Sequence, residues 1–218
     1  MGRHFIRVNV GCGQTPTAGW RNLDNSPSLR FARLRFGPWV LRRAGLIDDR
    51  QHEFMQFAQK HNIEYCNATQ RLPFPDAQVS IVYSSHMLEH LDRVDAQRFL
   101  REAFRVLSPG GAIRLAVPDL KRQAERYLDR GDADAFVAGS LMAVPRPRSL
   151  RDRMAQLAVG PRHHLWMYDG PSLCRLLETL GFERCDMVPP GETRLSHVGE
   201  LNLCERQGES VYVEGFKP

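Results

Sequence analysis

Short apolar runs alternate with amphipathic stretches along this chain. Five compact runs are typical of buried strands: residues 5–10, 20–24, 63–66, 79–83 and 112–117. Apolar positions then recur at helical spacing from Leu88 to Leu107, and Pro118-Asp119 opens another helical stretch. Strands and helices in this order predict an α/β fold with a mostly parallel sheet and helices on both faces.

Glycines and prolines mark the expected turns. Gly11 and Gly13 follow the first run and allow a sharp turn, residues 84–85 are expected as a short loop, and Pro109-Gly110-Gly111 is expected to end the helix. Only six residues separate Gly13 from Trp20, which at ~1.5 Å per residue allows a turn or two of helix. The first crossover helix is therefore expected to be stunted.

The second half of the chain predicts one clear helix and a closing pair of strands. The helix covers residues 171–180, and the strands cover 182–188 and 211–216. We expect residues 1–218 to form a single domain, with a helical, lid-like insertion at about 26–62 and a variable segment on the substrate side at about 130–165.

Composition agrees with a globular chain of 218 residues, with 42% hydrophobic and 25% charged residues. No apolar stretch approaches the ~18 residues of a membrane span, and the N-terminal run, interrupted by Arg7, lacks a signal-peptide core. The five cysteines form no CxxC pair, so neither a zinc ribbon nor a disulfide framework is expected. We therefore expect a cytoplasmic protein.

Arginine supplies 27 of the 30 basic residues, and the net charge is +5. Arginines gather at 30–43, beside Trp39 and Phe36, and again at 146–153. Such stretches steer anionic ligands, lie on a membrane surface, or form a solvated face. The sequence leaves these three alternatives open, peripheral membrane contact included.

The glycine loop disfavours a dinucleotide. Such a ligand needs a third glycine and a full helix to hold its pyrophosphate, and residues 14–19 leave no room for one. S-adenosylmethionine (SAM) has no pyrophosphate, and its ribose hydroxyls pair well with a carboxylate. Asp24, at the end of the second strand, stands where that carboxylate is needed.

Five stretches in order resemble a class I SAM-dependent methyltransferase, of the compact bacterial group related to the methyltransferase type 11 family. They lie within residues 5–120: 8–13, 19–24, 72–76, 84–90 and 105–111. The resemblance implies a Rossmann-like, mostly parallel seven-stranded sheet with an antiparallel C-terminal strand. It also implies SAM as the cofactor and a methyl transfer to an oxygen or nitrogen.

The resemblance assigns the cofactor contacts residue by residue. Glycine-loop residues border the methionine part of SAM, Asp24 holds the ribose, and Asn67 accepts from the adenine amino group. The full set is Gly11, Cys12, Gly13, Asp24, Asn67, Ala68, Ser84 and Ser85. Asn67 stands where the family more often has Asp.

The stretch from His86 to His90 reads HxxEH, which is formally the inverted zinc-peptidase motif. A divalent-cation site completed by His163 or His164 is a second interpretation. The alternative, which we adopt as the sequence-based expectation, is that Glu89 and His90 cap and pack the helix and no metal binds. An oxygen acceptor must lose its proton, so His86, with His164 second, is the candidate catalytic base.

We expect a small-molecule or saccharide acceptor. The fourth strand is followed by Ser84-Ser85-His86, where nucleic-acid amino methyltransferases usually carry an Asn/Asp-Pro-Pro-aromatic run, so nucleic acid is disfavoured. Two alternatives stay open: a catalytically silent SAM-fold scaffold protein, and an RNA-binding or RNA-methylating protein. The sequence does not determine the oligomeric state.

Overall fold

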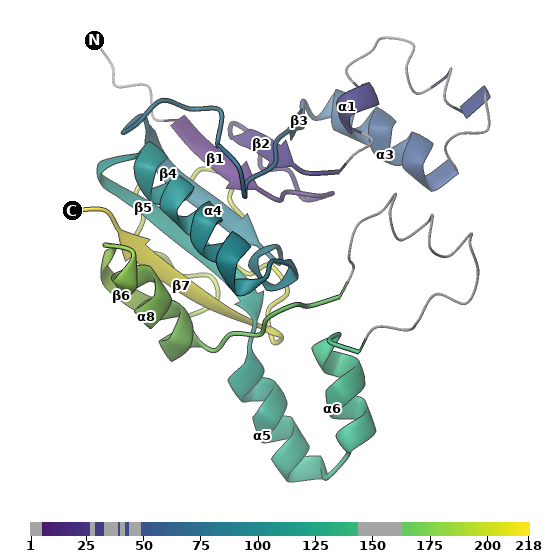
Figure 1. Cartoon of the computed structure of the whole chain (residues 1–218), viewed down its shortest axis with the longest axis vertical. Helices are drawn as coiled ribbons and strands as arrows, with labels where there is room; N and C mark the ends of the chain where they lie inside the picture. Colours follow the sequence, from purple (N-terminus) through teal and green to yellow (C-terminus); the bar gives the residue numbers. More distant parts are fainter. Residues whose placement is uncertain (1–5, 27–28, 33–38, 40–41, 44–48, 144–162) are drawn as a thin grey trace.

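A seven-stranded sheet in the order β3-β2-β1-β4-β5-β7-β6 organises the chain (Figure 1). The computed structural model describes residues 6–26, 29–32, 39, 42–43, 49–143 and 163–218. The strands are β1 (Ile6–Val10), β2 (Arg21–Asp24), β3 (Glu64–Tyr65), β4 (Val79–Ser85), β5 (Leu107–Pro118), β6 (Glu183–Val188) and β7 (Ser210–Phe216). The first five pair in parallel and β7 is antiparallel to both of its neighbours, which confirms the predicted sheet.

Aspartate side chains cap the starts of four helices. The helices are α1 (Leu29–Ala32), α3 (Asp49–Lys60), the 3₁₀ turn η1 (Leu88–His90), α4 (Arg93–Val106), α5 (Leu120–Arg130), α6 (Ala133–Ser140) and α8 (Gly170–Thr179). Asp92, Asp119, Asp132 and Asp169 accept backbone N–H groups at the starts of α4, α5, α6 and α8. Within the described part of the chain, none of these helices has the length and apolar character needed to cross a bilayer.

The single helix expected from Leu88 to Leu107 is wrong in its first turns. Only η1 forms there, Leu91 is extended, and α4 starts afresh because Asp92 caps the amides of Val94 and Asp95. Two turn predictions also fail. Residues 84–85 belong to β4, paired with β5, and Pro109-Gly110-Gly111 lies inside β5 after the helix has ended at Val106.

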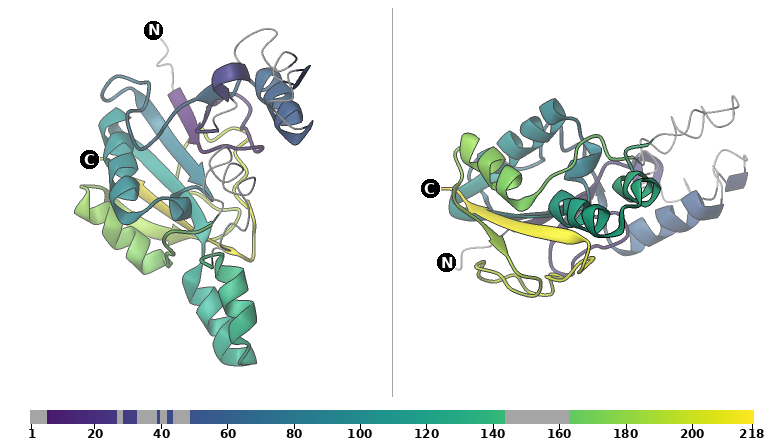
Figure 2. Two further views of the ribbon diagram at one scale, coloured as in Figure 1. Left: turned by 45° about the vertical axis from the view of Figure 1, so that its right-hand side comes forward. Right: turned by 90° about the horizontal axis from the view of Figure 1, so that it is seen from below.

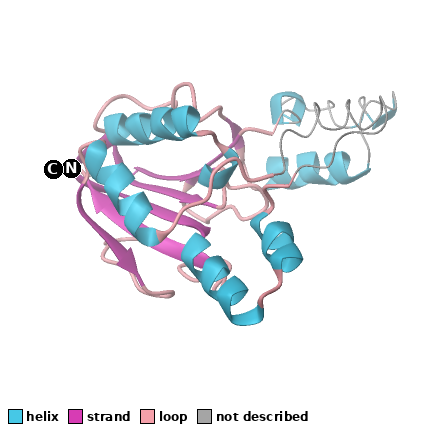
Figure 3. Cartoon of the chain, turned by 60° about the horizontal axis from the view of Figure 1, so that its bottom comes forward, coloured by secondary structure: helices cyan, strands magenta, loops and turns pink. Residues whose placement is uncertain are grey.

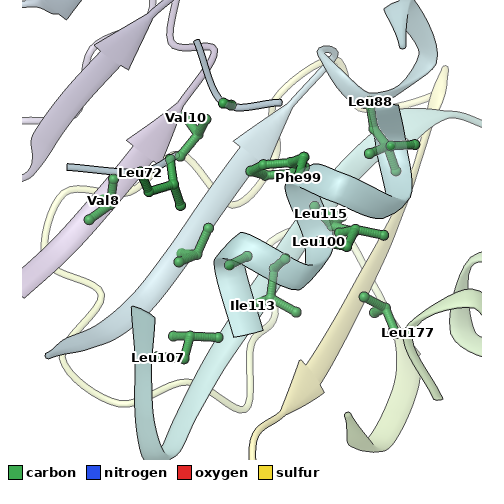
Figure 4. Packing of buried hydrophobic residues seen from close by; sticks show 14 of the residues in the cluster. Val8, Val10, Leu72, Leu88, Phe99, Leu100, Leu107, Ile113, Leu115 and Leu177 are labelled. Atoms are coloured by element: carbon green, nitrogen blue, oxygen red, sulfur yellow. The ribbon is translucent and has the colours of Figure 1, made fainter. Parts of the chain in front are cut away.

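The main hydrophobic core lies between the sheet and helices α4 and α8 (Figure 4). Phe99 and Leu100 of α4 and Leu177 of α8 are fully buried there, against Ile113 and Leu115 of β5. Each such side chain contributes about 1.5–3 kcal/mol by leaving water. Apolar packing therefore holds these helices on the sheet.

The opposite face of the central strands is covered mainly by irregular chain. Residues 189–209, which connect β6 to β7, run along this face (Figure 2). Leu195 and Leu201 in this connection pack with Trp20, Ile81 and Tyr83. The expectation of helices on both faces is thus wrong for the described residues. The first crossover is too short for a helix, and α1 and α3 lie beyond the β3 edge (Figure 1).

A buried ion pair fixes that irregular cover. The Arg114 guanidinium on β5 lies 2.6 Å from the Glu214 carboxylate on β7, and both side chains are 0% exposed. Arg114 also donates to the carbonyls of Glu192 and Leu203, while Glu214 accepts from the Thr193 hydroxyl and the Arg194 amide. Residues 192–203 are consequently tied to the sheet by charged side chains.

Helices α5 and α6 form a hairpin beyond the carboxyl end of β5 (Figure 3). The ring centroids of Tyr127 and Phe136 lie 5.4 Å apart and pack the two helices together. Gly131 ends α5 in a left-handed conformation, at φ +66°. The hairpin therefore stands at the edge of the sheet where ligands bind in open α/β folds.

Candidate functional site

The glycine loop turns tightly after β1. Gly11 and Gly13 have φ of +74° and +50°, and the amides of Gly11 and Cys12 donate to the Leu23 carbonyl at 2.8 and 3.1 Å. A Cβ on Gly11 would lie 2.5 Å from Cγ of Met87, whereas a Cβ on Gly13 would meet no described atom within 4 Å. Gly11 is thus needed for packing against Met87, and Gly13 borders open space.

Asp24 lies directly beside this loop. Its Oδ2 accepts the Gly13 amide at 3.0 Å, and its Oδ1 accepts the Ser26 amide at 2.8 Å. The side chain is only partly buried, and each carboxylate oxygen has a second lone pair. The structure therefore brings Gly13 and Asp24 together and leaves the carboxylate able to accept further hydrogen bonds.

The side chain of Cys12 points away from that space. It packs in a small cluster with Leu29 of α1 and with Met55, Ala58 and Ile63, from α3 and the residues after it. Burial, with the Asp24 charge second, raises the pKa of its thiol, which stays protonated. Cys12 can therefore contribute only its backbone to a ligand.

Asn67 and Ala68 follow β3. The Asn67 Oδ1 accepts from the amide and the hydroxyl of Thr69 at 3.1 and 2.9 Å. The oxygen that was expected to accept from an adenine amino group is therefore occupied, and the Nδ2 donor is the part of the side chain left to address a base. Ala68 is buried in the main core.

Ser84 and Ser85 lie at the carboxyl end of β4, and both are buried. The Ser84 hydroxyl has no hydrogen-bond partner among the described residues. Neither serine stands in an open loop, so any ligand contact they make comes from the end of the strand.

Two asparagines that the sequence analysis did not single out hold the segment after the glycine loop. Asn9 of β1 donates to the Thr15 carbonyl at 3.1 Å and to the Thr17 hydroxyl at 3.3 Å. Asn22 of β2 accepts the Thr17 amide at 2.8 Å and donates to the carbonyls of Thr17 and Trp20. The sequence does contain a signal for them, because each is a polar amide side chain within a predicted buried strand.

Both candidate bases line one cavity of about 410 Å³, between the carboxyl ends of β4 and β5 and the α5–α6 hairpin. Four arginines line it too: Arg122, Arg126, Arg130 and Arg206. The first three recur every fourth residue and so share one face of α5. Sequence reasoning missed them, although this spacing was visible.

His86 is held on every side. Its backbone has φ +50°, a left-handed conformation that is costly for a side chain of this kind, and its amide donates to the Ala116 carbonyl. Nε2 lies 2.8 Å from the Ser210 hydroxyl. Nδ1 lies 3.3 Å from both the Arg206 guanidinium and the Glu89 carboxylate.

His164 lies on the other side of Glu89, with Nε2 3.9 Å from its Oε1. Burial lowers the pKa of His164, the Glu89 charge opposes that shift, and His90 adds to it. A lowered pKa favours the neutral imidazole at neutral pH. The structure thus places His164 as a buried, uncharged ring at the cavity wall.

The glycine loop and the cavity are connected through neighbouring residues. Met87 packs on Gly11, and the preceding residue, His86, lines the cavity. On the opposite side, Glu205 accepts from the Thr15 hydroxyl at 3.2 Å, and the next residue is Arg206. A ligand on the loop and a ligand in the cavity would therefore be neighbours.

The arginine-rich stretches are described only in part. Residues 146–153 lie outside the described residues, as do Arg33, Arg35 and Phe36. Arg30 lies over the Tyr65 ring, 4.5 Å from its centroid, and donates to its hydroxyl. Trp39 is 64% exposed.

Comparison with known sequences gives two matches. A family profile described as a methyltransferase domain matches residues 42–115. A probable S-adenosylmethionine-dependent methyltransferase of Mycolicibacterium smegmatis is 44% identical over 48 residues. That match spans 22% of this chain and 18% of the M. smegmatis protein, so the chain matches less than a fifth of the relative's length.

A solved methyltransferase structure shares the fold. A SAM-dependent methyltransferase from Methanosarcina mazei aligns with a TM-score of 0.51 and 17% identity, over 100% of this chain and 94% of that one. Another from Archaeoglobus fulgidus aligns with a TM-score of 0.47 and 16% identity, over 99% and 87%. At these identities the likeness concerns the architecture alone.

Proposed function

We propose that this chain is a class I SAM-dependent methyltransferase, and that it transfers a methyl group from SAM to an oxygen or nitrogen of a small-molecule or saccharide acceptor. The observation that carries the proposal is the contact between Met87 and Gly11. It sets the glycine loop beside the cavity that His86 lines. A donor and an acceptor bound at these two places would meet at the end of β4.

The residues of the loop fit SAM. The space beside Gly13 and the free lone pairs of Asp24 suit a ribose with two hydroxyls. We assign the methionine part of SAM to the backbone of residues 11–13 and the adenine to Asn67 and Ala68. Ser84 and Ser85 contact the cofactor from the end of β4. When bound, SAM supplies a methyl group on a positively charged sulfur.

The protein's own task is to align the acceptor, exclude water and take a proton from an acceptor hydroxyl. We assign the proton to His86. The buried Glu89 carboxylate, 3.3 Å from Nδ1, stabilises the positive ring that results. Arg206 opposes that charge from the same distance, but it is exposed and therefore screened by solvent.

The cavity supports an acceptor of small size. Its volume of about 410 Å³ lies in the range of small-molecule sites, ~300–1,000 Å³. Asp119, Asp132 and Glu209 line it together with the four arginines, so its wall offers both acceptors and donors to a polar molecule such as a saccharide.

Calorimetry with SAM and with NAD tests the cofactor assignment. We expect SAM to bind and NAD not to bind. Asp24→Ala removes charge-assisted hydrogen bonds to the ribose and should weaken SAM binding by about 1–3 kcal/mol, or roughly 5- to 150-fold in Kd. Asp95→Asn, which removes a partly exposed carboxylate on α4, should leave the affinity unchanged. Equal affinity of the wild type and the Asp24→Ala variant would contradict the assignment.

Turnover is tested separately, by measuring S-adenosylhomocysteine released with a panel of hydroxyl, amine and saccharide acceptors. Activity on one class identifies the acceptor. SAM binding without turnover on any member supports the silent scaffold alternative. RNA affinity that falls steeply with rising salt supports the RNA alternative instead.

A further inference from the structure

Three side chains converge behind the cavity wall: Glu89, His90 and His164. Each offers one donor atom, and these atoms all lie within 4.8 Å of one another. Glu89 is 1% and His164 is 6% exposed, and His90 is partly buried. The α4 helix begins at Arg93 and is capped by Asp92, so capping of that helix does not explain Glu89 and His90.

The backbone holds the three residues in place. The 3₁₀ turn η1 contains Glu89 and His90, and the Glu89 carbonyl accepts the amides of Leu165 and Trp166 at 2.7 and 3.2 Å. These bonds bring the segment after residue 162 against η1. His164 therefore reaches Glu89 although 75 positions separate them in sequence.

The carboxyl group of Glu89 is buried and has few polar partners. Among the described residues, neither of its carboxylate oxygens has a hydrogen-bond partner. Two imidazole nitrogens lie within 4 Å of Oε1: Nδ1 of His86 at 3.3 Å and Nε2 of His164 at 3.9 Å. A buried carboxylate in such surroundings is costly unless a positive charge pairs with it.

His90 already has the tautomer that a metal ligand requires. Its Nδ1 lies 3.0 Å from the His163 carbonyl, which can only accept, so Nδ1 carries the hydrogen. Nε2 then carries the lone pair. A backbone carbonyl that fixes the ring in this way is a common second partner of metal-binding histidines.

We propose that Glu89, His90 and His164 form a binding site for a divalent transition-metal ion, with a coordination position open toward the cavity. Two imidazoles and one carboxylate suit the series from Mn²⁺ to Zn²⁺ better than Mg²⁺ or Ca²⁺, which prefer oxygen ligands. Ligands of a tetrahedral ion lie about 3.4 Å apart, so the three donors, now within 4.8 Å of one another, need to close by up to about 1.4 Å.

This inference reverses the expectation of no metal and makes His164 a ligand instead of a second base. Its consequence for catalysis, the orientation of an acceptor oxygen at the open position, rests on the proposed function. Binding of the ion itself does not, because none of the three residues belongs to the assigned SAM contacts.

Titration of chelator-stripped protein with Co²⁺, Mn²⁺, Zn²⁺ and Mg²⁺ tests the proposal without any turnover. We expect one site per chain for the first three ions, a visible Co²⁺ absorption band, and weak or no binding of Mg²⁺. Glu89→Gln and His90→Asn should each weaken binding roughly 100-fold or more. His61→Asn, at an exposed histidine after α3, is the matched control and should bind as the wild type does.

Absence of Co²⁺ binding to the wild type, or equal affinity in the wild type and the His90→Asn variant, would overturn the site. Circular dichroism checks that the variants fold. If Glu89→Gln does not fold, the test uses His90→Asn, because His90 is only partly buried. The wild-type titration decides the question even then. SAM calorimetry on the stripped protein separates the two proposals, because failure of SAM binding leaves the metal result standing and the reverse also holds.

Discussion

The two faces of the sheet are covered in different ways. On one face, α4 and α8 pack through fully buried apolar side chains such as Phe99, Leu100 and Leu177. On the other, residues 189–209 and 14–20 are fixed by the Arg114–Glu214 pair and by the amides of Asn9 and Asn22. A helix satisfies its own backbone groups, whereas an irregular segment needs side-chain partners for them. The comparison shows that polar side chains on the strands provide hydrogen-bond partners for the backbone of the irregular segments.

The strongest test of that difference is Glu214→Gln. It leaves the Arg114 charge buried without its counter-charge and should cost about 3–5 kcal/mol in the free energy of unfolding, measured by denaturant titration. Residues 189–209 should also become sensitive to proteases, because they lose the tie to the sheet. Asp95→Asn, which breaks the exposed pair with Arg98, should cost less than about 1 kcal/mol. Similar costs for the two variants would show that the buried pair does not fix the cover.

The helical face should respond through packing. Leu100→Ala, at a fully buried position of α4, should lower the free energy of unfolding by about 2–5 kcal/mol through lost burial and a cavity, and we expect about 3. Hydrogen exchange should speed up in α4 and the adjoining strands while residues 189–209 keep their protection. Loss of protection in both places would mean that the two covers are not independent. Leu128→Ala, at an 80% exposed position, is the control and should have little effect.

The smallest effect is expected at Asn22. Asn22→Ala removes three hydrogen bonds to the segment after the glycine loop and should cost about 1–3 kcal/mol. Hydrogen exchange at residues 14–20 should rise more than elsewhere, since only these groups lose their partners. A uniform change across the sheet would contradict a local role. Asn202→Ala, whose side chain bonds only the nearby Cys204 amide, provides the comparison.

Hydrophobic periodicity and turn residues were sufficient to predict the sheet from the sequence. Buried strands, the glycine loop with its short crossover, and the helix capped by Asp169 all follow from local patterns, and all are present. The irregular segment that covers the second face could not be predicted from local patterns. In the sequence, Arg114 is only a charged residue that interrupts an apolar run. Its meaning depends on Glu214, a residue 100 positions later.

The candidate site was also predicted only in part. His86 and His164 were named from their positions, and the cavity brings both together. The face of Arg122, Arg126 and Arg130 was missed because a helix pattern does not say where the helix will lie. The loss of the Asn67 oxygen to Thr69 depends on a turn two residues long, which the strand pattern does not specify.

The connection between β6 and β7 bears on how the protein is made. Glu205 and Arg206 reach Thr15 and His86, and the pair that anchors their segment includes Glu214. On the ribosome, the glycine loop therefore emerges long before the residues that brace it. A nascent chain that ends before residue 214 should hold most of the sheet but only half of the ligand cleft, so competence to bind SAM should come only after residue 214 has been made.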